Sequence, residues 1–131
     1  MVDSFCFVVS TNLSTFDIRA FRNGAIGFSF ASGGYWQLNC GFQLTWFSGS
    51  SRNTEGSYTE TIPWNVGTIL EVLISTYQVG STFGSNGDSW FQLLGFTGTS
   101  ITFAYQQAHN TTGVPCVPAF LIISNNTGPA E

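Results

Sequence analysis

The chain has 131 residues, a formal net charge of −4, and charged side chains at only 8% of its positions. Its basic residues are three arginines and no lysine, which excludes both the basic patch of a nucleic-acid-binding protein and a polybasic membrane-surface site. No run of about 20 apolar residues is present for membrane insertion, and the length suits one domain over residues 1–131.

The N-terminal part is predicted to form strands joined by tight turns. Residues 4–11 and 16–22 have strand composition, and residues 25–31 continue the pattern. Asn23-Gly24 separates the last two segments. This dipeptide favours a type I′ hairpin turn, because both central residues of that turn need a positive φ.

The stretch "YWQLNCGFQLTWF", residues 35–47, alternates strictly between apolar and more polar residues. Alternation predicts one strand with two faces, whose core face carries every even-numbered residue from Trp36 to Trp46. Thirteen extended residues would span about 43 Å, longer than usual, so a bulge or bend is expected at Gly41.

The odd-numbered face of this stretch carries Gln37, Asn39 and Gln43. Uncharged donors and acceptors can pair across an interface without the cost of burying ions. We therefore expect this face to meet a neighbouring subunit or the edge of the second layer rather than a glycan. Replacing Gln37 and Gln43 by Glu is then expected to dissociate the oligomer without unfolding it.

The remaining segments also read as strands. Residues 68–76 have apolar residues at both parities, which suits a strand covered on both sides; a helix over 65–77 is the alternative, disfavoured by its β-branched residues. About nine to ten short strands with glycine-rich turns predict an all-β fold, an antiparallel β-sandwich or jelly-roll-like domain. The other predicted strands are 57–62, 77–83, 89–96, 99–106 and 116–124.

The three cysteines, Cys6, Cys40 and Cys116, are widely spaced, and each lies in an apolar run. This spacing fits neither a zinc site nor a two-disulfide framework, so buried, reduced thiols are expected. A Cys6–Cys116 disulfide is the alternative in a secreted protein.

No catalytic constellation is recognisable, and we expect no enzyme activity, metal or cofactor. His109 is the only histidine, and no G-x-S-x-G or cysteine-protease signature accompanies it. The segment "SNGDS" (85–89) faintly resembles a calcium loop, although an Asn-Gly turn explains it better. A glycosidase pair of Glu60 with Glu71 or Asp88 stays open, but no feature supports it.

Glu71 lies within an apolar segment. A carboxylate there is expected to pair with Arg19 or Arg22, or to lie at a subunit interface, because burying it alone would be costly.

Aromatic and amide residues in the loops and at strand ends have the chemistry of a carbohydrate site. An aromatic ring stacks on the apolar face of a sugar, and Asn, Asp and Gln pair with its hydroxyls. The candidate ligand-binding residues are Trp64, Asn65, Asn86, Asp88, Trp90, Gln107 and His109.

The strand "FQLTWF" (42–47), the Asn-Gly turns, the near absence of charge and the ending "AFLIISNNTGPAE" (119–131) occur together in this chain. In this pattern the chain resembles the head domain of a trimeric viral attachment fibre, adenovirus-like or reovirus-like. The resemblance implies a β-sandwich homotrimer on a virion surface or otherwise extracellular, which binds a host cell-surface glycan or protein receptor. It carries over no site residues.

Two other classes remain open. A stand-alone lectin would share the sandwich and the aromatic loops, and a structural capsid-type subunit would use its apolar surface for assembly alone. In each case the low charge leaves little polar surface, so self-association, most simply as a trimer, is expected.

Overall fold

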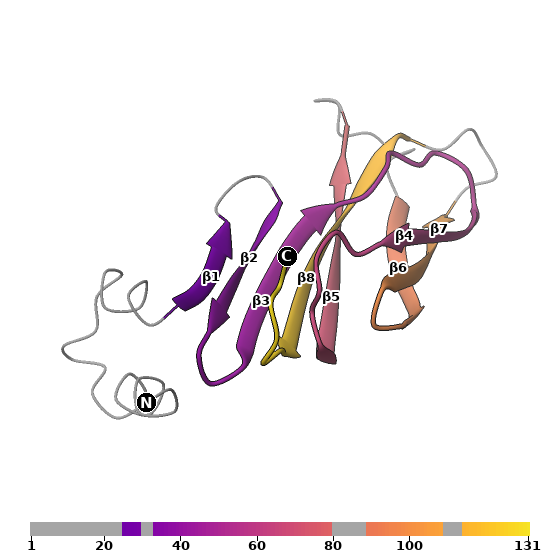
Figure 1. Cartoon of the computed structure of the whole chain (residues 1–131). Coiled ribbons are helices and arrows are strands. Elements are labelled where there is room, and N and C mark those ends of the chain that lie inside the picture. The colour runs from indigo at the N-terminus through magenta and orange to yellow at the C-terminus, as the bar shows by residue number, and fades with distance from the viewer. Residues whose placement is uncertain (1–24, 30–32, 80–88, 109–113) are drawn as a thin grey trace, which may run out of the picture.

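A computed structural model describes residues 25–29, 33–79, 89–108 and 114–131. The regular structure in these ranges is entirely β, which confirms the predicted all-β sandwich (Figure 1). The predicted strands 4–11 and 16–22 and the Asn23-Gly24 turn lie outside the described residues. The described strands are β1 (Ala25–Ser29), β2 (Gly34–Leu38), β3 (Phe42–Ser48), β4 (Gly56–Thr61), β5 (Thr68–Gln78), β6 (Ser89–Phe96), β7 (Ser100–Gln107) and β8 (Cys116–Asn125).

The strands form two antiparallel sheets. Sheet A has the order β1-β2-β3-β8-β5, and sheet B has the order β4-β7-β6. Sheet B packs against the β3-β8-β5 side of sheet A and leaves β1 and β2 beyond its edge (Figure 1). Part of the inner face of sheet A therefore needs a covering other than sheet B.

Aromatic rings fill the space between the sheets. Phe47 of β3 and Phe120 of β8 lie 4.9 Å apart between ring centroids, and Phe103 of β7 meets Phe120 edge-on at 5.4 Å. Phe91 of β6 contacts both Phe103 and Tyr105 in edge-on geometry. Such edge-to-face pairs are a favoured arrangement of buried rings, and they join the two sheets through one continuous core.

The prediction of a single strand over 35–47 is wrong, because the chain reverses direction at residues 39–41. The Gly41 amide donates to the Leu38 carbonyl at 3.0 Å, and Gln37 pairs with Gln43 across the hairpin. Gly41 has a φ of +99°, a conformation that favours glycine. The bend expected at Gly41 is therefore a complete hairpin turn.

The prediction that the even-numbered residues of this stretch form the core is also wrong. Gln37, Gln43 and Thr45 are fully buried, whereas Trp36 and Trp46 are only half-buried. Direct pairing of Gln37 with Gln43 keeps the odd-numbered residues of both strands on one face. That face is the inner one.

Strand β5 settles the helix alternative, since residues 68–78 pair with β8 along their whole length. A bulge between Ile69 and Glu71 changes which parity points inward: Ile69 faces the core before it, and Val72 and Ile74 after it. This shift explains the apolar residues at both parities. The predicted start of a new strand at 77 is wrong, because β5 continues to Gln78.

The cysteines differ from one another. Cys116 is a buried free thiol, as predicted, and this rules out the alternative Cys6–Cys116 disulfide. Cys40 is disulfide-bonded, so the prediction that all three thiols are reduced is wrong. Cys40 lies in the β2–β3 hairpin turn and is half-buried. Cys6 lies outside the described residues.

Candidate functional site

The predicted ligand-binding residues do not form one site. Trp64 and Asn65 lie in the β4–β5 loop, which is tied to the β6–β7 turn by the Ile62 amide donating to the Thr99 carbonyl at 2.8 Å. Trp90 is the second residue of β6 and Gln107 is the last residue of β7, at the opposite end of sheet B. The other three predicted residues, Asn86, Asp88 and His109, lie outside the described residues.

Trp64 and Asn65 are engaged within the chain. The Trp64 ring packs against the Tyr35 ring at a centroid distance of 6.0 Å. The Asn65 side chain donates to the Pro129 carbonyl at 3.0 Å and accepts from the Gly67 amide at 3.2 Å. The Trp64 contact holds the β4–β5 loop to β2, and the Asn65 contact with Pro129 holds it to the C-terminal residues 126–131, so both side chains have a structural role; their binding of a ligand stays a prediction.

Beneath this loop lies a buried amide network, which we define as the side chains of Gln37, Gln43 and Asn126 together with the backbone carbonyl of Asn65. Gln43 donates to the Asn65 carbonyl at 3.1 Å and accepts from the Asn126 side chain at 2.9 Å. Asn126 also donates to the Asn65 carbonyl at 2.9 Å. Gln37 donates to the carbonyls of Asn126, at 2.8 Å, and of Gly128.

The buried amide network satisfies backbone carbonyls of irregular chain. The β4–β5 loop and residues 126–131 cover the part of sheet A that lies beyond sheet B. The backbone carbonyls of such loops have no neighbouring strand whose amides could donate hydrogen bonds to them. Glutamine and asparagine donors supply those bonds. Of the two predicted neighbours of Gln37 and Gln43, another subunit is therefore wrong, because the loop that follows β4 of the second sheet and the C-terminal residues of the same chain cover them. Glutamates at both positions are now expected to unfold the chain rather than to dissociate an oligomer.

At the other end of the sandwich, Gln107 and Tyr105 secure the loops. The Gln107 amide donates to Glu55 at 3.2 Å, and the Tyr105 hydroxyl donates its one proton to the Val114 carbonyl at 2.8 Å and bonds the Ser89 hydroxyl at 3.0 Å. Burial raises the pKa of Tyr105, so its hydroxyl stays protonated at neutral pH and remains a donor.

Two of the three carboxylates considered for a glycosidase pair, Glu60 and Glu71, lie within the described residues. Arg52 pairs with Glu60 at 3.0 Å and lies over the Tyr58 ring at 4.4 Å, so Glu60 is engaged in an ion pair. Glu71 is exposed and accepts from the Val72 amide at 3.0 Å; its predicted partners, Arg19 and Arg22, lie outside the described residues. Within the described ranges, no group of three His, Cys, Asp or Glu residues could hold a metal ion.

A patch of uncharged side chains covers the outer face of sheet B. Phe91 points into the core, so Trp90 and Gln92 point outward, and Gln106 lies directly beside Trp90 on β7. The Trp90 side chain is 45% exposed. We call Trp90, Gln92 and Gln106 the Trp90 patch.

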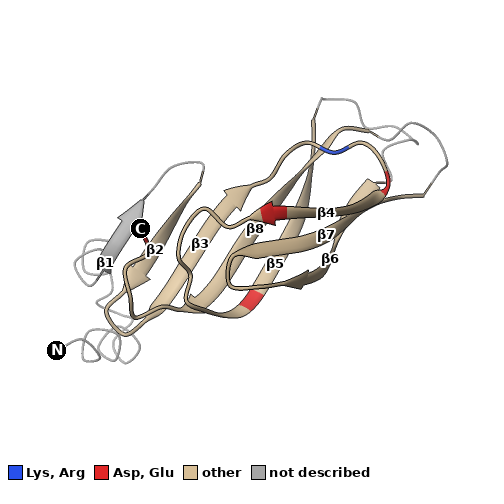
Figure 2. Cartoon of the chain, turned by 45° about the vertical axis from the view of Figure 1, so that its right-hand side comes forward, with Lys and Arg blue, Asp and Glu red and all other residues tan. Residues whose placement is uncertain are grey.

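The Trp90 patch has the chemistry that was predicted for the loops. An exposed indole beside two amide side chains can stack on a sugar ring and bond its hydroxyls. Figure 2 shows that β2, β3, β6, β7 and β8 carry no charged residue, so a ligand here would be recognised without ion pairs. Period-two alternation within 89–96 could have assigned Gln92 to this face beside Trp90.

No helix in the described part of the chain has the length and apolar character to cross a membrane. No family model matches the chain, and no curated protein matches it in sequence.

Solved structures of R-type pyocin tail fibres have a similar fold. An N-truncated R1-type pyocin tail fibre matches with a TM-score of 0.61 and 17% identity, over 82% of this chain and 97% of that one. A Pseudomonas aeruginosa R1 pyocin fibre comprising C-terminal residues 323–701 also matches at 0.61 and 17%, over 84% of this chain but only 32% of that one. An N-truncated R2-type fibre matches at 0.56 and 18%, over 74% and 36%.

These identities establish likeness of fold. The chain spans about a third of the longer fibre chains and nearly all of the shorter R1 chain. The predicted resemblance to an attachment fibre is thus confirmed at the level of the fold, and the matching fibres are pyocin tail fibres rather than adenovirus or reovirus heads.

Proposed function

We propose that this chain is the receptor-binding domain of a tail-fibre-type attachment protein, carried on the outer surface of a particle and acting by binding alone. The observation that carries the proposal is the fold shared with R-type pyocin tail fibres over as much as 84% of the chain. The Trp90 patch on sheet B adds an independent reason, since it combines an exposed aromatic ring with two amide side chains.

The ligand proposed for the Trp90 patch is an uncharged segment of a cell-surface glycan. The patch is open and lies on a regular sheet, so it suits a long chain of sugars better than a small enclosed molecule. Assembly as a homotrimer would present several such patches together, and linked weak sites gain affinity by multivalency.

The test is the binding of the labelled protein to a glycan array and to a panel of bacterial cells. Trp90→Ala should weaken binding at least 10-fold, because an aromatic anchor carries a large share of the binding energy at such surfaces. Phe96→Ala is the matched control, since Phe96 lies on the same strand and is 43% exposed against 45% for Trp90.

Binding to neither glycans nor cells would contradict the proposed function. A protein that folds and self-associates but binds no ligand would instead be a structural, capsid-type subunit. The exposed apolar residues of sheet A would then serve assembly alone. Binding by a monomer would favour a stand-alone lectin.

A further inference from the structure

The face of sheet A turned away from sheet B is apolar across four strands. Its residues alternate with the buried ones on each strand, and the pairing registers place them in cross-strand rows. We call this surface the outer face; its residues are Leu73 and Tyr77, which are exposed, and Trp36, Leu44, Trp46, Val117, Ala119, Leu121 and Ile123, which are half-buried.

The rows are continuous from one strand to the next. Trp46 of β3 pairs with Leu121 of β8, which pairs in turn with Leu73 of β5. Leu44 and Ile123 form the neighbouring row. Rows of this kind make a flat, contiguous apolar surface rather than scattered single residues, and surfaces of that kind mark interaction sites.

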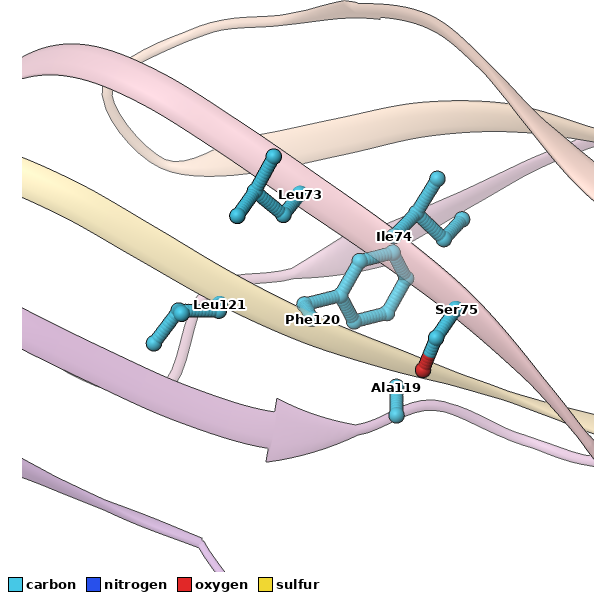
Figure 3. Close-up of a pocket in the computed structure, with 6 residues that line it drawn as sticks. All are labelled: Leu73, Ile74, Ser75, Ala119, Phe120 and Leu121. Atoms are coloured by element: carbon cyan, nitrogen blue, oxygen red, sulfur yellow. The ribbon is translucent and has the colours of Figure 1, made fainter.

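A shallow hollow of about 220 Å³ lies on the outer face between β5 and β8 (Figure 3). Leu73 and Leu121 border it at one end, and Ser75 and Ala119 at the other. Because serine and alanine are small, the sheet surface is lower there. A hollow of this size can receive one apolar side chain of another molecule.

The apolar character extends to the side of the sheet. Strand β5 is the last strand of sheet A among the described residues, and it is 11 residues long. Leu73 is 52% exposed and Tyr77 66%. Edge strands are usually protected by charged side chains, proline or bulges. The bulge and Glu71 of β5 lie before Val72, and residues 72–78 contain no charged residue and no proline.

We infer that the outer face of sheet A is the surface through which copies of this chain associate, with the Leu73–Leu121 hollow receiving a side chain of the neighbouring copy. The inference rests on the proposed function, because a fibre domain works as an assembled particle component. It replaces the amide face, which the C-terminal residues cover, as the subunit interface.

Size and charge favour a second copy as the occupant. Four strands about 4.8 Å apart, averaging about eight residues of about 3.3 Å, give roughly 500 Å² in projection. Side chains standing on the sheet enlarge this area toward the roughly 800 Å² that each partner buries in a standard interface. Glu71 is the one charged residue on the described strands of this face, and it lies on the outermost strand, where an interface has its polar rim.

The experiment compares Leu73→Glu with Leu94→Glu by light scattering of the full chain from 1 to 100 µM. Leu94 is the matched control, because it is 54% exposed but lies on sheet B. The wild type and Leu94→Glu should be oligomers. Leu73→Glu should be a folded monomer whose dissociation constant is at least 100-fold higher.

Radical footprinting of the wild type at the same concentrations covers the case in which Leu73→Glu fails to fold. Oxidation of Tyr77 should fall at least threefold as the protein assembles, while that of Trp90 should not change. A monomeric wild type, an oligomeric Leu73→Glu, or oxidation of Tyr77 that is independent of concentration would overturn the inference. The last result would mean that another segment of the same chain covers the face.

The two proposals fail in different ways. A monomer that binds glycan would remove the outer face as an interface and leave receptor binding intact. If Leu73→Glu dissociates the oligomer but the wild type binds neither glycan nor cells, the outer face remains the interface and the proposed receptor binding is wrong.

Discussion

At the scale of single residues, Gln43 shows how a polar side chain comes to lie at the centre of a small sandwich. It is fully buried; its side-chain nitrogen donates to the Thr45 hydroxyl at 3.0 Å and to the Asn65 carbonyl, and its oxygen accepts from Asn126. A buried amide is tolerated when its donors and acceptors are satisfied, and its loss leaves the partners unsatisfied.

Gln43→Ala is therefore expected to lower the free energy of unfolding by about 2–4 kcal/mol, since each buried group left without a partner costs about 1–3 kcal/mol. Urea denaturation measures the change. Gln92→Ala is the control: Gln92 is exposed on sheet B, and its removal should change stability by less than about 0.5 kcal/mol. Equal effects of the two substitutions would contradict the role given to the network.

The buried thiol of Cys116 makes the free energy of unfolding depend on pH in the alkaline range. Burial raises the pKa of its thiol, so the folded chain keeps a proton that the unfolded chain loses. The stabilisation is present in full below the unfolded-state pKa, about 8.5, and decreases as the pH rises above it. Tyr35 and Tyr105, whose pKa values are also raised mainly by burial, act in the same direction near pH 10.

We expect the free energy of unfolding to fall between pH 8.5 and 9.5, by at most about 1.4 kcal/mol per pH unit for one group. Cys116→Ala should be less stable at pH 7 because it leaves a cavity, yet its stability should fall less steeply over this range. Denaturation at several pH values measures both slopes. Parallel curves for the wild type and Cys116→Ala would refute the assignment.

At the scale of elements, the packing of the C-terminal residues on the β4–β5 loop decides how far sheet A is covered. Gly67 allows the backbone of the β4–β5 loop to lie directly against the backbone of Asn125 and Asn126. Its φ is +66°, and a Cβ atom there would lie 2.4 Å from the Asn125 carbonyl oxygen and 2.8 Å from the Asn126 Cα. Both are backbone atoms that cannot move aside cheaply. The Asn65 amide donating to the Ala130 carbonyl at 2.8 Å depends on the same approach.

Gly67→Ala should therefore destabilise the fold by at least about 1–2 kcal/mol, from the left-handed backbone alone, with the steric clash in addition. Thermal denaturation measures the loss of stability, and hydrogen exchange of the Gln37 and Gln43 side-chain amides measures the exposure of the buried amide network. Gly98→Ala is the control, because a Cβ there would meet no atom within 4 Å. Destabilisation of Gly98→Ala to the same degree would show that the approach at Gly67 is unimportant.

At the scale of the whole molecule, charge is sparse: of the described strands only β4 and β5 carry a charged residue, Glu60 and Glu71, and the Trp90 patch contains none (Figure 2). The described cation, Arg52, is already paired with Glu60. Recognition by this surface must use stacking, hydrogen bonds and apolar contact, which salt does not screen.

Binding to cells or glycan should accordingly change less than about threefold between 50 and 500 mM NaCl, since only interactions between exposed charges are strongly screened in that range. Titrations at the two salt concentrations test this, with the oligomeric state checked at each. A tenfold loss at high salt would assign recognition to charged groups instead.

The sequence by itself determined the β class, the strands near 57–62, 89–96, 99–106 and 116–124, and the glycine at the 39–41 turn, because period-two alternation and turn residues act locally. Only the tertiary structure decided the rest. Which face of Trp36–Trp46 points inward depends on what covers it: loop carbonyls require Gln37 and Gln43 as donors, whereas the tryptophans are left for the outer face. The disulfide of Cys40 and the separation of Trp64 from Trp90 likewise depend on where distant segments meet, and no local pattern encodes that.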